Sequence, residues 1–302
     1  MQCSEPFLPD ILSMQSEMHP DPTYEIDVSI LIAAHNRVEL TRDCLDSVFA
    51  HADPGIAMEI IVTDDCSSDG TDAFLASLGG RVRIISNAVR RCFGESMNRA
   101  ALESRGKYLC LLNNDTLVTP GWLIKLLDAA RADPAVGVVG NLHVTPATGR
   151  IDHAGMVFDQ ECHALHLYRD LDAAYPPAHV TREFQMVTGA CWLVPRALFL
   201  ELNGFDLVFK NGCEDADFCL RARQLGRKVL YVGDSMIYHH GASSPGRMDH
   251  EGSNLEYFYR KWRGRIKPDL EEYLRRDRMS GGQQDVETPE LPQIRDERGT
   301  PA

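Results

Sequence analysis

The sequence lacks several features that would assign it to a well-marked class of protein. No uninterrupted apolar run is long enough to span a membrane. No CxxC pair occurs among the nine cysteines, and their odd total argues against a disulfide framework. Residues 1–25 contain acids and prolines rather than a basic segment followed by an apolar core, so we do not expect a secretory signal peptide. These absences predict a protein with reduced thiols in the cytoplasm.

Positive charge is also scarce. Lysine and arginine total 31 against 44 aspartates and glutamates, which gives a formal net charge of -13 at pH 7. This balance argues against general nucleic-acid binding, which needs a basic face. The 302 residues, 44% of them hydrophobic, suffice for a substantial buried core. The acidic balance still allows a divalent cation that bridges the protein to an anionic ligand.

Apolar segments of strand length alternate with helical patterns through the first half of the chain. The strand-like segments are residues 27–35, 58–65, 82–86, 107–113 and 136–140. The helical patterns are residues 39–49, 69–78, 94–104 and 120–133. This alternation predicts an α/β fold with a mostly parallel sheet that helices cover on both faces. In such sheets, ligands bind at the carboxyl ends of the strands.

Polar residues follow the first two of these strands. His35, Asn36 and Arg37 end the first strand, and Asp64 and Asp65 end the second. Turn chemistry explains the Ser, Asp and Gly that come next in "VTDDCSSDGT". It explains the two adjacent acids less well, because like charges repel unless they have donors or a cation. A nucleobase imide N–H is one such donor.

The strand at 107–113 also ends in polar residues, Asn113, Asn114 and Asp115. Mg²⁺ and Mn²⁺ prefer oxygen ligands, often one or two carboxylates together with substrate phosphates. An Asx turn that leads into the next helix is the alternative interpretation. Together, the three strand ends predict a binding site on one rim of the sheet.

A second group of acids and histidines lies in residues 209–244. Capping of a helix that starts near Asp217 needs one or two acids, so Glu214 and Asp215 are surplus and one of them is a candidate general base. The adjacent His239 and His240 end a strand-like segment, where alternation points them to opposite faces. At most one of them should therefore serve a site, as a metal ligand.

Three further segments carry weaker signals. Residues 142–184 break the alternation and are expected to lie over the sheet, where they and His153 would select the acceptor, while His163 and His166 are expected to be solvated loop residues. The basic, aromatic segment 257–267 favours an amphipathic helix that packs its rings on the core. Contact with a membrane surface or an anionic lipid-linked acceptor is the alternative. The polar tail from about residue 277 is expected to be disordered.

The chain resembles the inverting glycosyltransferases with the A-type nucleotide-sugar fold, which include rhamnosyltransferases and cell-surface polysaccharide glycosyltransferases. The resemblance covers residues 26–262, and its pieces occur in the family's order. These pieces are "VSILIAAHNR", "VTDDCSSDGT", "NAVRRCFGESMNRA", "LLNNDT", "VTGACWLVPR", "GFDLVFKNGCEDADFCLRARQLG" and "HHGASS". Each piece is of low specificity, but seven in order are highly specific.

The resemblance implies a single glycosyltransferase domain at residues 26–265. Its nucleotide-sugar half would be residues 26–141 and its acceptor half residues 142–265. An irregular leader at 1–25 would precede it, and a C-terminal helix with a disordered tail would follow at 266–302. The implied location is the cytoplasm, with peripheral contact to the inner face of the membrane through 257–267 as the alternative.

The implied reaction transfers a sugar, with inversion, from a UDP- or dTDP-sugar to a hydroxyl of a glycan or lipid-linked acceptor. Asp215 would be the base, with Glu214 beside it. Asp115 and His239 would bind Mg²⁺ or Mn²⁺, and His239 is preferred because the family's H-x-G spacing fits when counted from it. The implied nucleotide-sugar contacts are Ala34, Asn36, Arg37, Asp64, Asp65, Arg91, Asn98, Asn113 and Asn114.

The sequence also departs from the family pattern. Ala34 and His35 replace a small residue and Tyr, "NND" replaces D-x-D, and Arg90 and Arg91 stand where Gly or Asn is usual and would add a phosphate contact. A non-catalytic nucleotide-sugar or glycan-binding module on the same fold is the alternative function. A nucleotidyltransferase is disfavoured, because "AAHNRVEL" after the first strand has no glycine for a phosphate loop.

Overall fold

The computed structural model describes residues 24–241 and 247–280. Its strands are β1 (Val28–Ala34), β2 (Met58–Asp64), β3 (Arg83–Ser86), β4 (Tyr108–Asn113), β5 (Thr116–Val118), β6 (Val136–Thr145), β7 (Arg150–His153), β8 (Met156–Phe158), β9 (Ala164–His166), β10 (Arg182–Phe184), β11 (Cys191–Pro195) and β12 (Lys228–His239). Its α-helices are α2 (Val38–Ala50), α3 (Thr71–Ser77), α4 (Phe93–Glu103), α5 (Trp122–Ala132), α6 (Arg196–Glu201), α7 (Glu214–Gln224), α8 (Glu251–Trp262) and α9 (Leu270–Ser280). Two 3-10 helices, η2 (Pro176–His179) and η3 (Arg247–His250), complete the elements.

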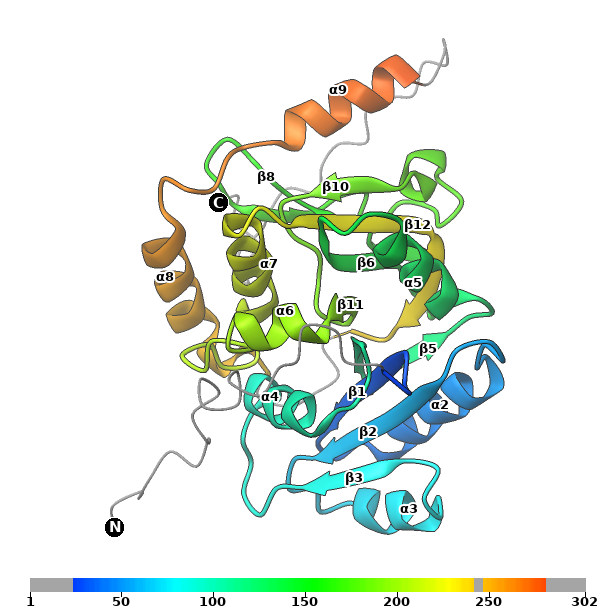
Figure 1. Ribbon diagram of the computed structural model, residues 1–302. Helices are drawn as coiled ribbons and strands as arrows, with labels where there is room; N and C mark the ends of the chain where they lie inside the picture. Colours follow the sequence, from blue (N-terminus) through cyan, green and yellow to red (C-terminus); the bar gives the residue numbers. More distant parts are fainter. Residues whose placement is uncertain (1–23, 242–246, 281–302) are drawn as a thin grey trace.

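One large sheet runs through the molecule in the order β10-β12-β6-β11-β4-β1-β2-β3 (Figure 1). Strands β3, β2, β1 and β4 pair in parallel, and β6 pairs in parallel with β12. The predicted α/β fold is therefore confirmed, with parallel pairing of its first strands, and the sheet as a whole is mixed. Strand β11 differs, because it runs antiparallel between β4 and β6. The two halves of the chain are thus joined through a strand whose direction the sequence pattern did not reveal.

Helices cover both faces of the sheet, as predicted. Alternate residues of β1 point to opposite faces, and both faces are fully buried: Leu31 belongs to one core cluster, and Ile30 and Ile32 belong to the other. Helices α2, α3 and α5 supply the second cluster, and α4, α6, α7 and α8 supply the first. Burial on both faces explains why the first strands appear in the sequence as continuous apolar runs.

A hydrogen-bonded network holds the amino ends of β1, β2 and β4 together. The Glu59 side chain, which is 9% exposed, accepts hydrogen bonds from the Ser29 hydroxyl (2.7 Å) and from the backbone N–H of Arg105 (2.7 Å). The same hydroxyl accepts one from Gly106 N–H (2.8 Å). A Cβ at Gly106 would lie 2.4 Å from the backbone nitrogen of Ser29, so only glycine allows this approach. This network holds together the edge of the sheet that lies opposite the carboxyl ends of the parallel strands.

The segment after residue 140 is more regular than expected. Strand β6 continues to Thr145, past the expected end, and β7 returns antiparallel to it. His163 is exposed and pairs with Asp159, as expected of a loop residue. The prediction for His166 was wrong, since it lies in β9, is half-buried and has its Nδ1 3.1 Å from Nδ1 of the fully buried His153.

The C-terminal helices pack on the body of the molecule. Phe258 and Trp262 of α8 are each 2% exposed, which confirms the expected packing of this aromatic segment on the core. Helix α9 continues to residue 280, so the tail does not begin near 277. Asp277 instead forms an ion pair of 2.5 Å with Arg182 and a hydrogen bond with Tyr168.

The expected leader, except for its last two residues, and the tail after residue 280 lie outside the described residues. Within residues 24–241 and 247–280, no helix is both long and apolar enough to cross a membrane.

Candidate active site

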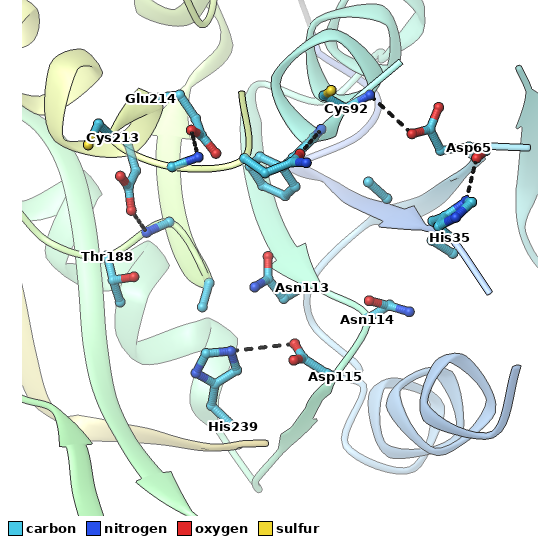
Figure 2. Close-up of a pocket in the computed structure, with 18 of the residues that line it drawn as sticks. His35, Asp65, Cys92, Asn113, Asn114, Asp115, Thr188, Cys213, Glu214 and His239 are labelled. Carbon is cyan, nitrogen blue, oxygen red and sulfur yellow. Dashed lines mark hydrogen bonds and ion pairs between the residues drawn. The ribbon is translucent and has the colours of Figure 1, made fainter. Parts of the chain in front are cut away.

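A cavity opens where the carboxyl ends of the parallel strands meet loops from the second half of the chain (Figure 2). The residues that line it are Ala33, Ala34, His35, Asp65, Arg90, Cys92, Phe93, Asn113, Asn114, Asp115, Thr188, Gly189, Ala190, Asn211, Gly212, Cys213, Glu214, Asp215 and His239. The three polar strand ends, the acids of α7 and the end of β12 thus meet at one place, as the sequence predicted. Eight of the thirteen predicted site residues line the cavity: Ala34, Asp65, Asn113, Asn114, Asp115, Glu214, Asp215 and His239.

Asp65 ties the second strand to the loop that precedes α4. Its Oδ1 accepts hydrogen bonds from the Asn87 side-chain amide (2.8 Å) and the backbone N–H of Arg91 (2.8 Å). Its Oδ2 accepts one from Cys92 N–H at 3.2 Å. The imidazole Nδ1 of His35 is 2.8 Å from the carbonyl oxygen of Asp65, so the loop after β1 is joined to the same point. These hydrogen bonds hold the Asp65 carboxylate in one position at one end of the cavity.

The neighbouring predicted residues shape these loops without lining the cavity. Asn36 and Arg37 both adopt left-handed backbone conformations (φ 57° and 58°), which turn the chain sharply from β1 into α2. The side-chain oxygen of Asn36 accepts a hydrogen bond from Ser68 N–H (2.8 Å), and Asp64 Oδ1 accepts one from Ser67 N–H (3.1 Å). Turn chemistry thus explains Asp64 as well, which the sequence analysis had left open.

Asp69 serves the starts of two helices beside the cavity. Its Oδ2 accepts a hydrogen bond from the N–H of Val38, the first residue of α2, at 2.9 Å. Its Oδ1 accepts one from the N–H of Thr71, the first residue of α3, at 3.2 Å. Asp69 therefore satisfies backbone donors at the starts of two helices that have no partner within their own helix.

Two other predicted contacts also face away from the cavity. The Arg91 guanidinium pairs with Glu95 one turn along α4, at 2.8 Å, and its neighbour Arg90 lines the cavity instead. The Asn98 amide is 2% exposed and makes two hydrogen bonds with the backbone of Phe205, at 2.8 and 3.0 Å. Asn98 therefore positions the loop that follows α6, behind the cavity wall.

Strand pairing brings Asp115 and His239 together. The short strand β5 pairs antiparallel with the end of β12, with Thr116 opposite His239, and the N–H of His240 donates to the carbonyl oxygen of Asp115 at 3.0 Å. The Nε2 of His239 lies 3.4 Å from Asp115 Oδ1, and Figure 2 shows both side chains at the cavity wall. His240 is exposed and does not line the cavity, so the structure separates the two histidines as alternation predicted.

A second acid stands behind His239. Asp152 of β7 accepts a hydrogen bond from Nδ1 of His239 at 2.9 Å, so the ring lies between two carboxylates. Burial acts to lower the pKa of His239, but its hydrogen bonds with Asp115 and Asp152 raise it to about 9. The same contacts hold the pKa of Asp152 below its ordinary value, against the opposing effect of burial. The site between Asp115 and Asp152 therefore favours a positively charged group.

The donor set also suits a divalent cation. A carboxylate oxygen and an imidazole nitrogen 3.4 Å apart have the chemistry and spacing of two neighbouring ligands of one ion. His143, Asp152 and His239 form a further group whose ligand atoms all lie within 4.8 Å of one another. Asp152 and His143 were not among the predicted site residues, because residues 142–184 were expected to select the acceptor.

Two acids of α7 line the cavity and the third, Asp217, is buried in the core. The helix begins at Glu214, three residues earlier than expected, and places Glu214 and Asp215 in the cavity wall. Glu214 accepts a hydrogen bond from Gly212 N–H (2.6 Å), and Asp215 Oδ2 accepts one from Gly189 N–H (2.7 Å). Each acid thus fixes the loop beside it.

Asp217 has a different role from the predicted helix cap. It is fully buried and accepts hydrogen bonds from Nε of Arg221 (2.7 Å) and the indole N–H of Trp262 (2.9 Å). Nζ of Lys261 also lies 2.7 Å from this carboxylate. Asp217 therefore joins α7 to α8 inside the protein, and the prediction of a capping role was wrong.

Comparison with known proteins places this cavity in a family. The model of Glycosyl transferase family 2 matches residues 29–202, more than half of the chain. The O-antigen biosynthesis protein RfbC of Myxococcus xanthus is 30% identical over 225 residues, which cover 72% of this chain and 17% of that protein. An N-acetylglucosaminyl-diphospho-decaprenol L-rhamnosyltransferase of Mycobacterium tuberculosis is 24% identical, with 63% of this chain and 69% of that protein covered. The chain spans between about a sixth and a third of the length of three curated relatives that it matches.

Solved structures agree on the fold. GalNAc-T7 with UDP, GalNAc and Mn²⁺ superposes with a TM-score of 0.60 at 18% identity, covering 84% of this chain and 55% of that one. The mannosyltransferase PcManGT of Pyrobaculum calidifontis, in complex with GDP-Man and Mn²⁺, gives 0.59 at 18% identity, covering 86% and 71%. The sheet with its flanking helices is therefore the A-type glycosyltransferase fold, and the chain belongs to glycosyl transferase family 2.

Proposed function

We propose that the protein is a metal-dependent inverting glycosyltransferase. It would move a sugar from a nucleoside-diphosphate donor, UDP- or dTDP-linked, to a hydroxyl of a glycan or lipid-linked acceptor in cell-surface polysaccharide assembly. The observation that carries the proposal is that Asp65, the Asp115–His239 pair and Asp215 line one cavity. The relatives named for O-antigen synthesis and rhamnosyl transfer support the acceptor class.

The donor would occupy the half of the cavity built by the first strands. Asp65, held in place by three hydrogen bonds, would accept the imide N–H of the base, while Ala34, Asn113 and Asn114 would contact the nucleoside and sugar. Asn36, Arg37, Asp64, Arg91 and Asn98 would keep the walls of this subsite in shape. Arg90 would face the diphosphate.

Asp115 and His239 would hold Mg²⁺ or Mn²⁺, which supplies neutralisation of the negative charge that develops on the leaving diphosphate. The Mn²⁺ complexes of GalNAc-T7 and PcManGT, which share this fold, support this choice of ion. Asp152, on the other side of His239, adds negative charge to the site, so the site binds a cation in preference to a neutral group.

Asp215 would act as the general base. The acceptor oxygen would form a bond to the anomeric carbon while the bond from that carbon to the diphosphate oxygen breaks, and the hydroxyl proton would pass to the Asp215 carboxylate. A single displacement inverts the anomeric carbon. The hydrogen bond from Gly189 N–H fixes one carboxylate oxygen, and Glu214 holds the adjacent loop through Gly212.

The test is Asp215→Asn, which keeps the shape of the side chain and removes its basicity. Transfer should fall by about 10²–10⁴-fold, the usual cost of losing a general base. Nucleotide binding, measured by calorimetry with UDP and dTDP in Mn²⁺ and in Mg²⁺, should be nearly unchanged. Asp234→Asn, an exposed acid of β12, is the matched control and should leave transfer unaltered.

A screen of nucleotide sugars for hydrolysis and transfer identifies the donor and separates the two functions considered for this fold. Turnover that requires Asp215 supports the enzyme. Tight binding of a nucleotide sugar without hydrolysis or transfer in any combination would favour a binding module and contradict the proposal. Near-normal turnover by a folded Asp215→Asn protein would reject Asp215 as the base.

A further inference from the structure

His239 is held from both sides, and only one of the two partners belongs to the cavity. Its Nε2 faces Asp115 at 3.4 Å, and its Nδ1 faces Asp152 at 2.9 Å. Asp152 lies on β7, its side chain is 15% exposed, and it does not line the cavity. The cavity wall therefore has a second layer, built from the segment that follows β6.

The position of Asp152 decides which nitrogen of His239 carries a proton. A neutral imidazole has one N–H and one lone pair, and the group that accepts the N–H fixes the tautomer. When a cation takes the place of the proton on Nε2, a carboxylate at Nδ1 keeps the other proton there, so that the lone pair of Nε2 lies on the side of Asp115 and the cavity. Carboxylates placed in this way also fix the orientation of the ring and strengthen it as a metal ligand.

The Asp152 carboxylate is itself held in place. Its Oδ1 lies 3.4 Å from the Arg169 guanidinium, while its Oδ2 bonds His239. The Arg169 side chain is largely exposed, so the hydrogen bond with His239 is the stronger of the two contacts.

His143 stands next to this pair, with its ring 5.7 Å from that of His239, and has its own fixed orientation. Its Nε2 lies 3.0 Å from the side-chain oxygen of Asn141. The Asn141 amide donates to Ser235 Oγ (3.1 Å), and that hydroxyl donates to a backbone carbonyl, so the oxygen of Asn141 is left to accept from His143. The fully buried Nδ1 of His143 consequently keeps its lone pair and has no hydrogen-bond partner among the described residues.

We propose that Asp152 is a positioning residue for the cation site: it holds His239 so that Nε2 is available as a ligand beside Asp115. This inference rests on the proposed function, because it assumes the cation held by Asp115 and His239. It gives residues 150–153 a role on the donor side of the reaction, whereas the sequence analysis assigned this segment to the acceptor.

The test measures Mn²⁺ binding to the full chain by calorimetry and electron paramagnetic resonance, without substrate. Asp152→Ala should weaken Mn²⁺ binding by about 10–100-fold, as loss of such an outer-shell carboxylate typically does. Asp152→Asn should weaken it less, because the amide oxygen still accepts from Nδ1. The spin-echo modulation from a coordinated imidazole nitrogen should be present in the wild-type protein and diminished in Asp152→Ala. A merely structural role would not move that signal.

Two matched variants make the result decisive. His143→Gln should retain Mn²⁺ affinity. If it loses as much affinity as His239→Ala, the cation is bound directly by His143, Asp152 and His239, and the positioning role is overturned. If Asp115→Ala abolishes binding while Asp152→Ala binds as tightly as the wild type, this inference alone fails. Unchanged binding by Asp115→Ala would overturn the proposed cation site and this inference together. Thermal melts confirm folding, and Asp152→Asn, nearly isosteric with Asp152, serves if the alanine variant does not fold.

Discussion

Asp215 and Asp217 are two residues apart on one helix, and the structure predicts opposite consequences for the same substitution at each. Asp217 is fully buried and bonds Arg221, Lys261 and Trp262 at 2.7, 2.7 and 2.9 Å. Asp217→Asn removes the negative charge. Its side-chain NH₂ group would also face at least one of the N–H donors of Arg221, Lys261 and Trp262. Removing one partner of a buried ion pair costs about 3–5 kcal/mol.

The remaining contacts place the expected loss near the low end of that range. Arg221 keeps its hydrogen bonds to two backbone carbonyls at 2.6 and 2.8 Å, and Lys261 keeps Asp206 at 2.7 Å. We therefore expect Asp217→Asn to lower the free energy of unfolding by about 3 kcal/mol. In urea the midpoint should fall by about 1 M or more, since the dependence of unfolding free energy on urea is typically a few kcal/mol per molar.

The assay is urea unfolding followed by fluorescence, combined with calorimetric binding of the nucleotide on the folded protein. Asp215→Asn is the matched control: it should lose transfer but lower the unfolding free energy by only about 1 kcal/mol, since its half-buried carboxylate accepts hydrogen bonds from Gly189 N–H and Ala216 N–H and the amide oxygen keeps one of them. Asp217→Asn should bind the nucleotide normally while folded. A midpoint for Asp217→Asn within about 0.3 M of the wild type would refute the reasoning, because a buried ion pair would then have contributed almost nothing.

Three further predictions follow from other contacts. Gly189→Ala should lower transfer at least tenfold with the fold intact, because its Cβ would lie 2.9 Å from Cβ of Asp215 and would displace that side chain. Displacing a catalytic group by 1 Å typically costs about 10²-fold in rate. Transfer assays measure the loss, and circular dichroism checks the fold. Asp277→Ala should reduce the unfolding free energy by about 1–3 kcal/mol, because it removes the ion-pair partner of Arg182, which keeps only its hydrogen bonds to Tyr168 and Pro177; a chain ending at residue 280 should match the full chain in urea. Burial acts to raise the pKa of Glu59, but its hydroxyl and guanidinium partners hold that pKa below its ordinary value. Its stabilising effect should thus be present above the ordinary carboxyl pKa and disappear as pH falls through the lowered value, so that wild type and Glu59→Gln converge in stability in acid.

Each of these predictions has a control and a contrary outcome. Gly55→Ala adds a methyl group with no atom within 4 Å and should leave transfer unchanged; equal losses at both glycines would remove the argument from the Asp215 contact. Unchanged stability of the Asp277→Ala protein would show that the contacts of Asp277 with Arg182 and Tyr168 add nothing to the fold. A stability difference between Glu59→Gln and the wild type that is constant from pH 7 to the acid limit would contradict the lowered pKa.

The sequence revealed the half of the site that parallel strands build. Strands β1, β2 and β4 are buried on both faces and therefore appear as continuous apolar runs, and the polar residues at their ends necessarily meet at one rim. The positions of Asp65 and Asp115 at that rim could therefore be predicted without any knowledge of the sheet order. Strand alternation indicated only that at most one of His239 and His240 serves a site. The choice of His239, and its place beside Asp115, came from the family resemblance.

The remaining features depend on contacts between distant segments. The side chains of Asp215 and Asp217 point in directions about 200° apart around the helix axis, so one can face the cavity while the other faces the core. The local sequence pattern does not determine that the helix begins at Glu214. Asp152 carries no motif, and its meeting with His239 arises because β7 and β12 both pair with β6. The sequence contains no local signal for such a meeting.

The antiparallel strand β11 has a consequence for the order in which the chain can fold. It fills the gap between β4 and β6, and the other neighbour of β6, β12, comes later still in the chain. Until residues 191–195 have left the ribosome, β4 has an unpaired edge and β6 lacks both of its main partners. Such edges are templates for pairing with other chains. A nascent chain or proteolytic fragment that ends before residue 191 should therefore be prone to aggregation, and solubility should return only when the chain extends through both β11 and β12.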